Sequence, residues 1–281
     1  MILMSKIYVF LKLIRPLNVI IAGISVVIGA TVASQVIFWW KMLFAVISAG
    51  LIAGAGNTIN DYFDLEIDRI NKPQRPLPRG EIRPRTAVLF SVFLFLVGIN
   101  LSILINPVAV IISVLVSLCL IAYSWSFKKK LLIGNLTVAF ISSLAFVYGG
   151  IITKDYRLSL VPAALSFFFH LGREILKDLE DFKGDSTYGA KTLAVVKGEK
   201  FALVIVSIIF AILSILIFVP FVFGLFSVIY LVVGLLGVIL ILSYVVYSMW
   251  RDSSVKNLGK LNTLLKISMC FGLLALFLGR T

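Results

Sequence analysis

Two clusters of aspartates with the same spacing are the residues of this chain best suited to chemistry. Each follows the pattern D-x2-D-x3-D at the end of an apolar stretch, and each member of the second lies 117 residues after its counterpart in the first. The clusters contain six of the 13 acidic residues, namely Asp61, Asp64, Asp68, Asp178, Asp181 and Asp185. So many carboxylates at matched positions in a chain with few acids predict an active site.

The spacing of the aspartates indicates a metal-dependent reaction. Carboxylates at positions i, i+3 and i+7 lie on one face of a helix, so each cluster presents its side chains in one direction. Two carboxylates about 6 Å apart repel one another by ~3 kcal/mol at an effective dielectric constant of about 20, and we therefore expect a cation between them. Oxygen ligands without His or Cys, combined with substrate phosphates, are typical of Mg²⁺. The two clusters together predict a diphosphate that Mg²⁺ bridges to both.

A plainer interpretation exists for each cluster alone. A single D-x3-D sequence at the end of a membrane span is more often a solvated helix terminus than a site. Two copies in the same register, on the same side of the membrane, favour the site.

Basic residues after the first cluster are suited to phosphate oxygens. Residues 69–80 contain three prolines and several cations, which describe a stiffened loop rather than a long helix. Lys72 and Arg75 are the predicted diphosphate contacts. The cations further along the loop, Arg79, Arg83 and Arg85, are equally well explained as determinants of membrane topology.

Polar residues in two later segments are placed to join the site. Tyr123 and Lys128 stand about one turn apart at the end of an apolar stretch, where Lys128 can reach phosphate and Tyr123 can hydrogen-bond, although aromatic residues at this level are also ordinary membrane anchors. Arg173 and Glu174 lie inside another apolar stretch, where ionisable groups usually mark a cavity or a pair. We expect Arg173 to pair with Glu174 or a neighbouring Asp.

The elements that must position these residues are membrane-spanning helices. The chain has 281 residues, 60% of them hydrophobic, and its mean hydropathy of +1.09 excludes a soluble globular domain. Apolar runs of the roughly 17–25 residues needed to cross a bilayer recur along its whole length. We predict an all-α membrane protein with nine transmembrane helices, at about 17–35, 41–60, 86–105, 108–126, 134–153, 159–177, 201–220, 225–249 and 263–279.

The distribution of basic residues predicts the orientation in the membrane. Twenty-two of the 26 Lys and Arg residues lie at the N-terminus or in alternate loops, and only Lys41, Lys154, Arg157 and Arg280 lie on the other side. The positive-inside rule therefore places the N-terminus and both acidic clusters in the cytoplasm and the C-terminus outside. The net charge of +13 then reflects topology and anionic membrane lipids, and no nucleic-acid partner is expected.

The two acidic clusters belong to a weak internal repeat. Arg79-Gly80-Glu81 and Lys197-Gly198-Glu199 follow the clusters at nearly the same offset, so span, acidic motif, basic loop and span recur in order, roughly over 41–105 and 159–220. This order is typical of a parallel duplication with both motifs facing one cavity. We treat residues 1–281 as a single transmembrane domain.

The motifs resemble those of the UbiA superfamily of intramembrane prenyltransferases over essentially the whole chain. The family's N-x3-D-x3-D motif is matched by Asn60, Asp64 and Asp68, and its D-x3-D motif by Asp181 and Asp185. Its Y-x3-K motif would place a Lys at residue 127, whereas here the Lys stands one residue later, at 128. The resemblance implies a central cavity under cytoplasmic cap loops, Mg²⁺ held by both motifs, and a lipid-facing opening for long chains.

Within that family, the run from Asn60 to Pro73 and on to Gly80 looks most like archaeal digeranylgeranylglyceryl phosphate synthases. That resemblance implies transfer of a geranylgeranyl group from geranylgeranyl diphosphate to the hydroxyl of a lipid-phosphate acceptor, geranylgeranylglyceryl phosphate. Chlorophyll synthases have a similar run. An aromatic, quinone-precursor or tetrapyrrole acceptor therefore stays open as an alternative.

Two other classes of membrane protein share some of these sequence features. CDP-alcohol phosphotransferases also use membrane aspartates and a divalent metal, but their D-G-x2-A-R element is absent, since Asp61 is followed by Tyr62 and Asp68 by Arg69. A transporter is compatible with intramembrane acids and an internal repeat. Against a transporter, both clusters lie on one side of the membrane and the opposite connections carry almost no ligands.

Overall fold

The computed structural model describes residues 2–36, 38–153, 155–182, 186 and 189–280. Within these ranges every regular element is a helix, apart from a single bridge between Phe226 and Arg280. The long helices are α2 (Pro16–Ala33), α3 (Trp39–Phe63), α5 (Pro84–Ile103), α6 (Pro107–Trp125), α7 (Ile133–Gly150), α8 (Leu160–Glu180), α11 (Glu199–Val222) and α14 (Val255–Leu278). A ninth long segment is continuous through α12 (Val228–Gly234), the π-helical η3 (Leu235–Ile239) and α13 (Leu240–Arg251).

These nine segments, counted over the described residues, confirm the predicted helical membrane fold. Eight of them are long and apolar enough to cross a membrane, and the other is α8, which carries the charged residues of the second motif. Most boundaries agree with the predicted ones within a few residues. The exception is α14, which begins at Val255 because the Ser254 side chain accepts a hydrogen bond from the backbone N–H of Asn257 and starts the helix early.

Proline fixes the starts of several helices. Pro16, Pro84 and Pro107 occupy the first positions of α2, α5 and α6, where a missing backbone N–H costs nothing. The Asn106 side chain also accepts a hydrogen bond from the backbone N–H of Ala109 at 2.8 Å. These helices therefore begin at defined residues, and their lengths then determine which residues lie at their opposite ends.

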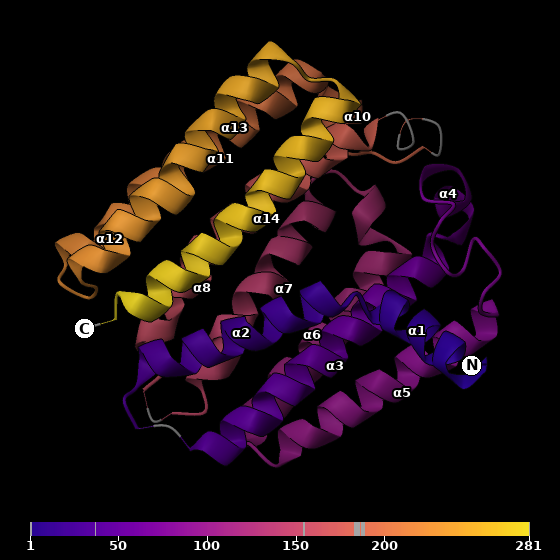
Figure 1. Ribbon diagram of the computed structural model, residues 1–281, viewed down its shortest axis with the longest axis horizontal. Coiled ribbons are helices and arrows are strands. Elements are labelled where there is room, and N and C mark those ends of the chain that lie inside the picture. Colours follow the sequence, from indigo (N-terminus) through magenta and orange to yellow (C-terminus); the bar gives the residue numbers. More distant parts are fainter. Residues whose placement is uncertain (1, 37, 154, 183–185, 187–188, 281) are drawn as a thin grey trace.

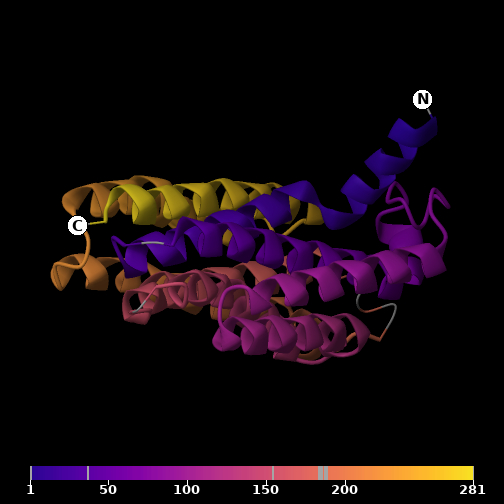
Figure 2. The ribbon, with the colours of Figure 1, turned by 90° about the horizontal axis from the view of Figure 1, so that it is seen from below.

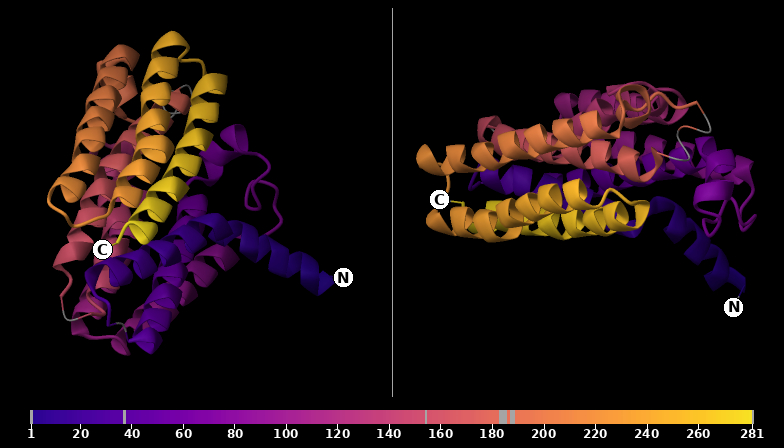
Figure 3. Two further views of the ribbon diagram at one scale, coloured as in Figure 1. Left: turned by 60° about the vertical axis from the view of Figure 1, so that its left-hand side comes forward. Right: turned by 90° about the horizontal axis from the view of Figure 1, so that it is seen from above.

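The long helices pack in a bundle with α2 near its middle. Helix α2 contacts α3, α7 and α14, α3 packs against α5 and α6, and α8 packs against α7, α11 and α14. The C-terminal helices α11 to α14 lie together along one side of the bundle (Figure 1 and the left view of Figure 3). Buried apolar side chains of α8, α11, α13 and α14 make the largest core cluster.

A short helix at the N-terminus was not predicted. Helix α1 (Ile2–Ile14) projects from the bundle at an angle (Figure 2). It is anchored by Leu13, which is fully buried against Leu77, Ile82 and Ala87. The chain turns from α1 into α2 at Arg15, whose φ of 53° lies in the left-handed region that residues other than glycine rarely adopt.

The first acidic motif does not lie on one uninterrupted helix, as its spacing predicted. Helix α3 ends at Phe63, Asp64 stands at the junction, and Asp68 belongs to α4 (Leu65–Asn71). Backbone hydrogen bonds from Asp64 to Asn60 and from Asp68 to Asp64 carry the helical pattern across the junction. The three carboxylates therefore still follow one another along one side, but across a bend.

The chain continues in a similar way after each motif. After α3 and α4, helix α5 packs back against α3; after α8 and the short α10 (Leu193–Lys197), α11 packs back against α8. This order agrees with the predicted arrangement of span, motif, loop and span. The internal duplication itself stays a prediction.

Candidate active site

The predicted site residues come from different helices whose ends meet at one end of the bundle, near α4 (Figure 1). Helices α3 and α8 end there with the acidic motifs, α6 ends there just after Tyr123, and α7 begins there. Hydrogen bonds and ion pairs between side chains join these elements. Residues far apart in sequence therefore form one polar region.

Arg75 bridges two carboxylates of the first motif. Its Nη1 lies 3.1 Å from Oδ1 of Asp61 and forms a second ion pair with Asp68. Asp61 and Asp68 are only 2% and 4% exposed, so this guanidinium offsets much of the cost of burying the two carboxylates. The predicted diphosphate contact thus occupies the region between the carboxylates.

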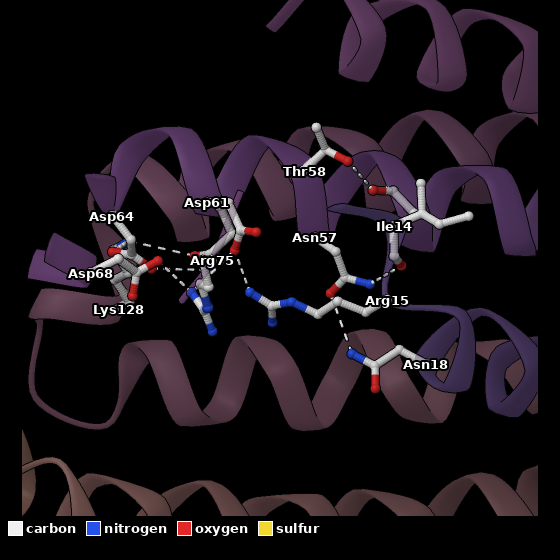
Figure 4. A network of polar contacts seen from close by, with 12 residues as sticks. Ile14, Arg15, Asn18, Asn57, Thr58, Asp61, Asp64, Asp68, Arg75 and Lys128 are labelled. Carbon is white, nitrogen blue, oxygen red and sulfur yellow. Dashed lines mark hydrogen bonds and ion pairs between the residues drawn. The ribbon is translucent and has the colours of Figure 1, made fainter. Parts of the chain in front are cut away.

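Arg15, one of the N-terminal basic residues that predict the membrane orientation, is also a site residue. Its guanidinium forms an ion pair with Asp61, and Figure 4 shows Arg15 and Arg75 both reaching that carboxylate. The left-handed turn at Arg15 lies beside α3, where Ile14 O accepts a hydrogen bond from Asn57 Nδ2 at 2.9 Å. The sequence feature that could have identified Arg15 as a site residue is its position directly before Pro16, which begins a membrane span.

Asp64 is held by partners from two elements. Nδ2 of Asn60 donates to Oδ2 of Asp64 at 2.8 Å, and Lys128 forms an ion pair with Oδ1 (Figure 4). Lys128 lies in the single 3-10 turn η1 (Phe127–Lys129) that follows α6. A Cβ on Gly134 would lie 2.7 Å from Lys128 Cα, so only glycine at that position lets this turn pack against the start of α7.

The second motif is partly described. Oδ2 of Asp178 accepts a hydrogen bond from Nδ2 of the buried Asn135 at 2.8 Å, and Asp181 follows the last residue of α8, half-buried. Asp185 lies outside the described residues. Tyr123 is half-buried and lies within electrostatic range of both Asp64 and Asp178.

Two groups in α4 and at its end have perturbed pKa values. Burial raises the pKa of Asp68 above its ordinary value, although the Arg75 guanidinium opposes this effect. Burial lowers the pKa of Lys72, and the nearby Asp181 partly restores it. Lys72 therefore lies within electrostatic range of the second motif, while Asp68 also acts on it from the first.

The ion pair predicted within α8 is present. Arg173 Nη1 lies 3.1 Å from Oε1 of Glu174, and Lys177 Nζ lies 3.6 Å from Oε2. Glu174 is 7% exposed, so this carboxylate is shared by two cations in a largely buried setting. In contrast, Arg79 is exposed and pairs only with Glu81 among the described residues.

The donor atoms of this region suit a hard cation. Asn60, Asp61, Asp64 and Asp68 offer oxygen atoms, and the cationic groups of Arg15, Arg75 and Lys128 all reach these carboxylates, which shows that positive charge has access to them. No three carboxylates converge on one point in the described part of the chain, which omits Asp185. The residues fit Mg²⁺ in donor chemistry.

Comparison with known proteins identifies the family. The model of the UbiA prenyltransferase family matches residues 22–269. The chain belongs to the UbiA prenyltransferase family. It is therefore an intramembrane prenyltransferase, as the two aspartate motifs predicted.

Curated UbiA-family relatives resemble the chain over most of its length. The digeranylgeranylglyceryl phosphate synthase of Methanosphaera stadtmanae is 34% identical over 96% of this chain and 98% of its own length. That of Thermococcus gammatolerans is 37% identical over 95% and 96%, respectively. That of Sulfurisphaera tokodaii reaches 45% over 73% of this chain and 76% of its own length.

Solved structures of the UbiA family share the fold. A structure described for digeranylgeranylglyceryl phosphate synthase in membranes superposes with a TM-score of 0.79 at 33% identity, covering 98% of both chains. A UbiA homologue from Archaeoglobus fulgidus bound to DMAPP and Mg²⁺ has a TM-score of 0.72 at 20% identity, covering 95% of this chain and 99% of its own. The second likeness concerns the fold alone.

Proposed function

We propose that this UbiA-family protein transfers a geranylgeranyl group from geranylgeranyl diphosphate to the hydroxyl of geranylgeranylglyceryl phosphate, giving digeranylgeranylglyceryl phosphate. The main support is that several relatives named for this activity match almost the whole chain, at 34% identity in one case and 37% in another. The arrangement of carboxylates and cations at the candidate site supports the same reaction. The aromatic, quinone-precursor and tetrapyrrole acceptors are the alternatives that the assay below separates.

The first part of the proposal concerns the donor. We assign Asn60, Asp64 and Asp68 of the first motif, and Asp181 and Asp185 of the second, to holding Mg²⁺, with Asp61 and Asp178 as further carboxylates of the repeat. When bound, Mg²⁺ supplies a Lewis acid that neutralises the diphosphate as it leaves. An Archaeoglobus fulgidus homologue of the same fold binds DMAPP and Mg²⁺, which supports a prenyl diphosphate and Mg²⁺ as ligands but not the individual residues.

The second part concerns the protein's own cations. Lys72 and Arg75 come from the loop after α4, and Lys128 comes from the turn after α6. Arg75 and Lys128 pair with carboxylates of the first motif, and Lys72 lies within electrostatic range of both motifs. From these positions they can donate to diphosphate oxygens and stabilise the negative charge that develops as the bond to the allylic carbon breaks. Tyr123, within electrostatic range of both motifs, is proposed as a hydrogen-bond partner of the substrate.

The third part concerns the acceptor. Its hydroxyl oxygen attacks C1 of the prenyl chain, a carbon–oxygen bond forms as diphosphate departs, and the proton passes to a carboxylate or to the departing diphosphate. Burying a twenty-carbon chain contributes about 15 kcal/mol at ~0.8 kcal/mol per carbon, so both lipid substrates stay in the membrane while only their polar ends reach the motifs.

The orientation of the protein is part of the proposal. The excess of Lys and Arg around the motifs supports a cytoplasmic N-terminus and cytoplasmic motifs, with the C-terminus outside. Reporter fusions at the C-terminus and in the loop after α6 measure this directly. A cytoplasmic C-terminal reporter would contradict it.

One assay tests the function. Purified protein is incubated with Mg²⁺ and geranylgeranyl diphosphate, and either geranylgeranylglyceryl phosphate or an aromatic acceptor is added. We expect a diether product with the lipid acceptor only, and no turnover in Asp64→Asn or Asp181→Asn. Equal use of unrelated acceptors would sink the lipid assignment, and full activity in either variant would contradict the site.

A further inference from the structure

The last turn of α8 carries acidic side chains on two different faces. Successive residues of a helix are turned by about 100°, so Glu180 lies about 160° away from Asp178 and about 100° away from Asp181 around the helix axis. Asp181 still follows the helical pattern, because its backbone N–H donates to the carbonyl oxygen of Lys177 at 2.9 Å. When Asp178 and Asp181 face the candidate site, Glu180 therefore faces another part of the bundle.

The side on which Glu180 lies is covered by α14. Nδ2 of Asn262 donates to Oε2 of Glu180 at 2.6 Å. A Cβ on Gly259 would lie 3.0 Å from Oε1 of the same carboxylate, so the missing side chain lets Glu180 lie close against α14. Lys266, one turn beyond Asn262, is also within electrostatic range of Glu180. Glu180 is therefore held by α14, a helix that carries neither aspartate motif.

The Asn262 amide does not serve packing. Asn262 is only 7% exposed, and its Oδ1 is buried without a hydrogen-bond partner in the described part of the chain. A buried amide that is only partly satisfied is less favourable than an apolar side chain of similar size. Packing alone favours leucine here, as at the buried Leu261 and Leu265 of the same helix. The contribution of the amide is therefore its bond to Glu180.

A second asparagine holds the same turn of α8 on another face. Nδ2 of Asn135, near the start of α7, donates to Oδ2 of Asp178 at 2.8 Å. Both α7 and α14 pack along α8. The turn that bears Asp178 and Asp181 is thus bound by two neighbouring helices at different angles around its axis. Rotation of this helix end is therefore restricted.

We propose that Asn262 and Glu180 are positioning residues, whose hydrogen bond fixes the direction in which the end of α8 presents Asp178 and Asp181 to a divalent cation. The proposal rests on the assignment of the second motif to Mg²⁺ and adds two residues that do not touch the ion. Replacing groups that orient metal ligands typically costs about 10- to 100-fold in metal affinity or activity. Asn262 therefore stabilises the arrangement of the site rather than the fold.

Binding of Mn²⁺, a substitute for Mg²⁺, tests this role without turnover. Free Mn²⁺ is measured by electron paramagnetic resonance, and the binding that is lost in Asp181→Asn defines the contribution of the second motif. Asn262→Leu should weaken that contribution about tenfold. Its melting temperature should stay the same or rise, because the unsatisfied amide is removed and the half-buried Glu180 can turn to water. Thr263→Leu is the matched control, since Thr263 is the exposed neighbour on α14 and its hydroxyl donates to the carbonyl oxygen of Gly259 in its own helix.

Substitutions of Glu180 test the same hydrogen bond from its other end. Glu180→Gln keeps an oxygen that accepts from Asn262 and should bind Mn²⁺ as the wild type does. Glu180→Met removes the acceptor and should match Asn262→Leu. In turnover assays, the Mg²⁺ concentration that gives half the maximal rate should rise by about the same factor in Asn262→Leu and Glu180→Met.

Three results would overturn the proposal. The first is wild-type Mn²⁺ affinity in Asn262→Leu, and the second is an equal loss of affinity in Glu180→Gln and Glu180→Met, which would show that the charge matters and the hydrogen bond does not. The third is a melting temperature that falls together with the affinity, which would assign the pair to the fold alone. Wild-type Mn²⁺ binding in Asp181→Asn would instead overturn the metal assignment of the second motif, and this role with it.

Discussion

Lys128 forms an ion pair with Asp64, a residue 64 positions earlier that stands where α3 gives way to α4. The contact joins the turn after α6 to the first acidic motif. The lysine stands one residue later than the family pattern places it, yet the 3-10 turn over Phe127–Lys129 still brings it to the carboxylate. The shift in sequence is therefore absorbed by local backbone geometry.

Replacing Lys128 tests its role at the site. Lys128→Met should lower kcat/KM for geranylgeranyl diphosphate by about 10- to 100-fold, because one charge-assisted hydrogen bond is worth about 1.5–3 kcal/mol. Lys130→Met is the matched control, since Lys130 is exposed on the same turn and lies over the Phe127 ring. Steady-state kinetics with varied donor measure both. Equal effects of the two substitutions would mean that only the loop's overall charge matters.

Lys72 predicts a specific pH dependence. Burial lowers its pKa, so Lys72 loses its proton at a lower pH than an ordinary lysine, and the proposed charged contact with the diphosphate is lost as pH rises through that pKa. The KM for the donor should therefore increase toward alkaline pH. In Lys72→Arg the guanidinium stays charged, and the KM should remain flat over the same range. Parallel pH profiles for the two proteins would exclude Lys72 as the titrating group.

Much of the fold was predictable from the sequence. Apolar runs long enough to cross a bilayer have few other structures open to them, since backbone groups in lipid must be satisfied within the helix. The two aspartate motifs and Lys128 were predictable as candidate site residues as well. Clustered charges of one sign at the ends of membrane spans repel one another and therefore indicate an oppositely charged partner. Their placement at one end of the bundle follows from alternating helix direction.

Contacts that depend on loop conformation were not predictable. Arg15 reaches Asp61 through a left-handed turn that no local pattern specifies, and Arg75 reaches back across a proline-rich loop. The bend at Asp64 interrupts a helix that the i, i+3, i+7 spacing predicted to be continuous. Repulsion between the carboxylates requires positive charge between them, and part of that charge is supplied by the protein's own arginines.

A double-mutant cycle measures the Arg15–Asp61 pair. Arg15→Ala and Asp61→Asn should each destabilise the protein, and the double variant should lose less than the sum, with a coupling free energy of about 1–3 kcal/mol. The reason is that the Asp61 carboxylate is only 2% exposed. Its replacement by Asn leaves the Arg15 guanidinium without its charged partner. The Glu66–Arg69 pair, 2.9 Å apart and exposed on α4, is the control and should couple by less than about 0.5 kcal/mol. Similar couplings for the two pairs, measured by denaturation in detergent, would contradict the structural role of Asp61.

Close packing of α2 on α7 gives a prediction about stability. A Cβ on Gly149 would overlap the carbonyl oxygen of Val26, and a Cβ on Gly29 would overlap that of Phe146, so the two helices touch through their backbones. Gly149→Ala should lower the free energy of unfolding by about 1–3 kcal/mol, because the helices must separate to admit a methyl group. Gly272→Ala is the control: its Cβ would meet nothing closer than Val238 at 3.6 Å, and it should be neutral or slightly stabilising. The two variants are compared by thermal unfolding in the same detergent, and an unchanged melting temperature in Gly149→Ala would show that α2 and α7 do not pack this closely.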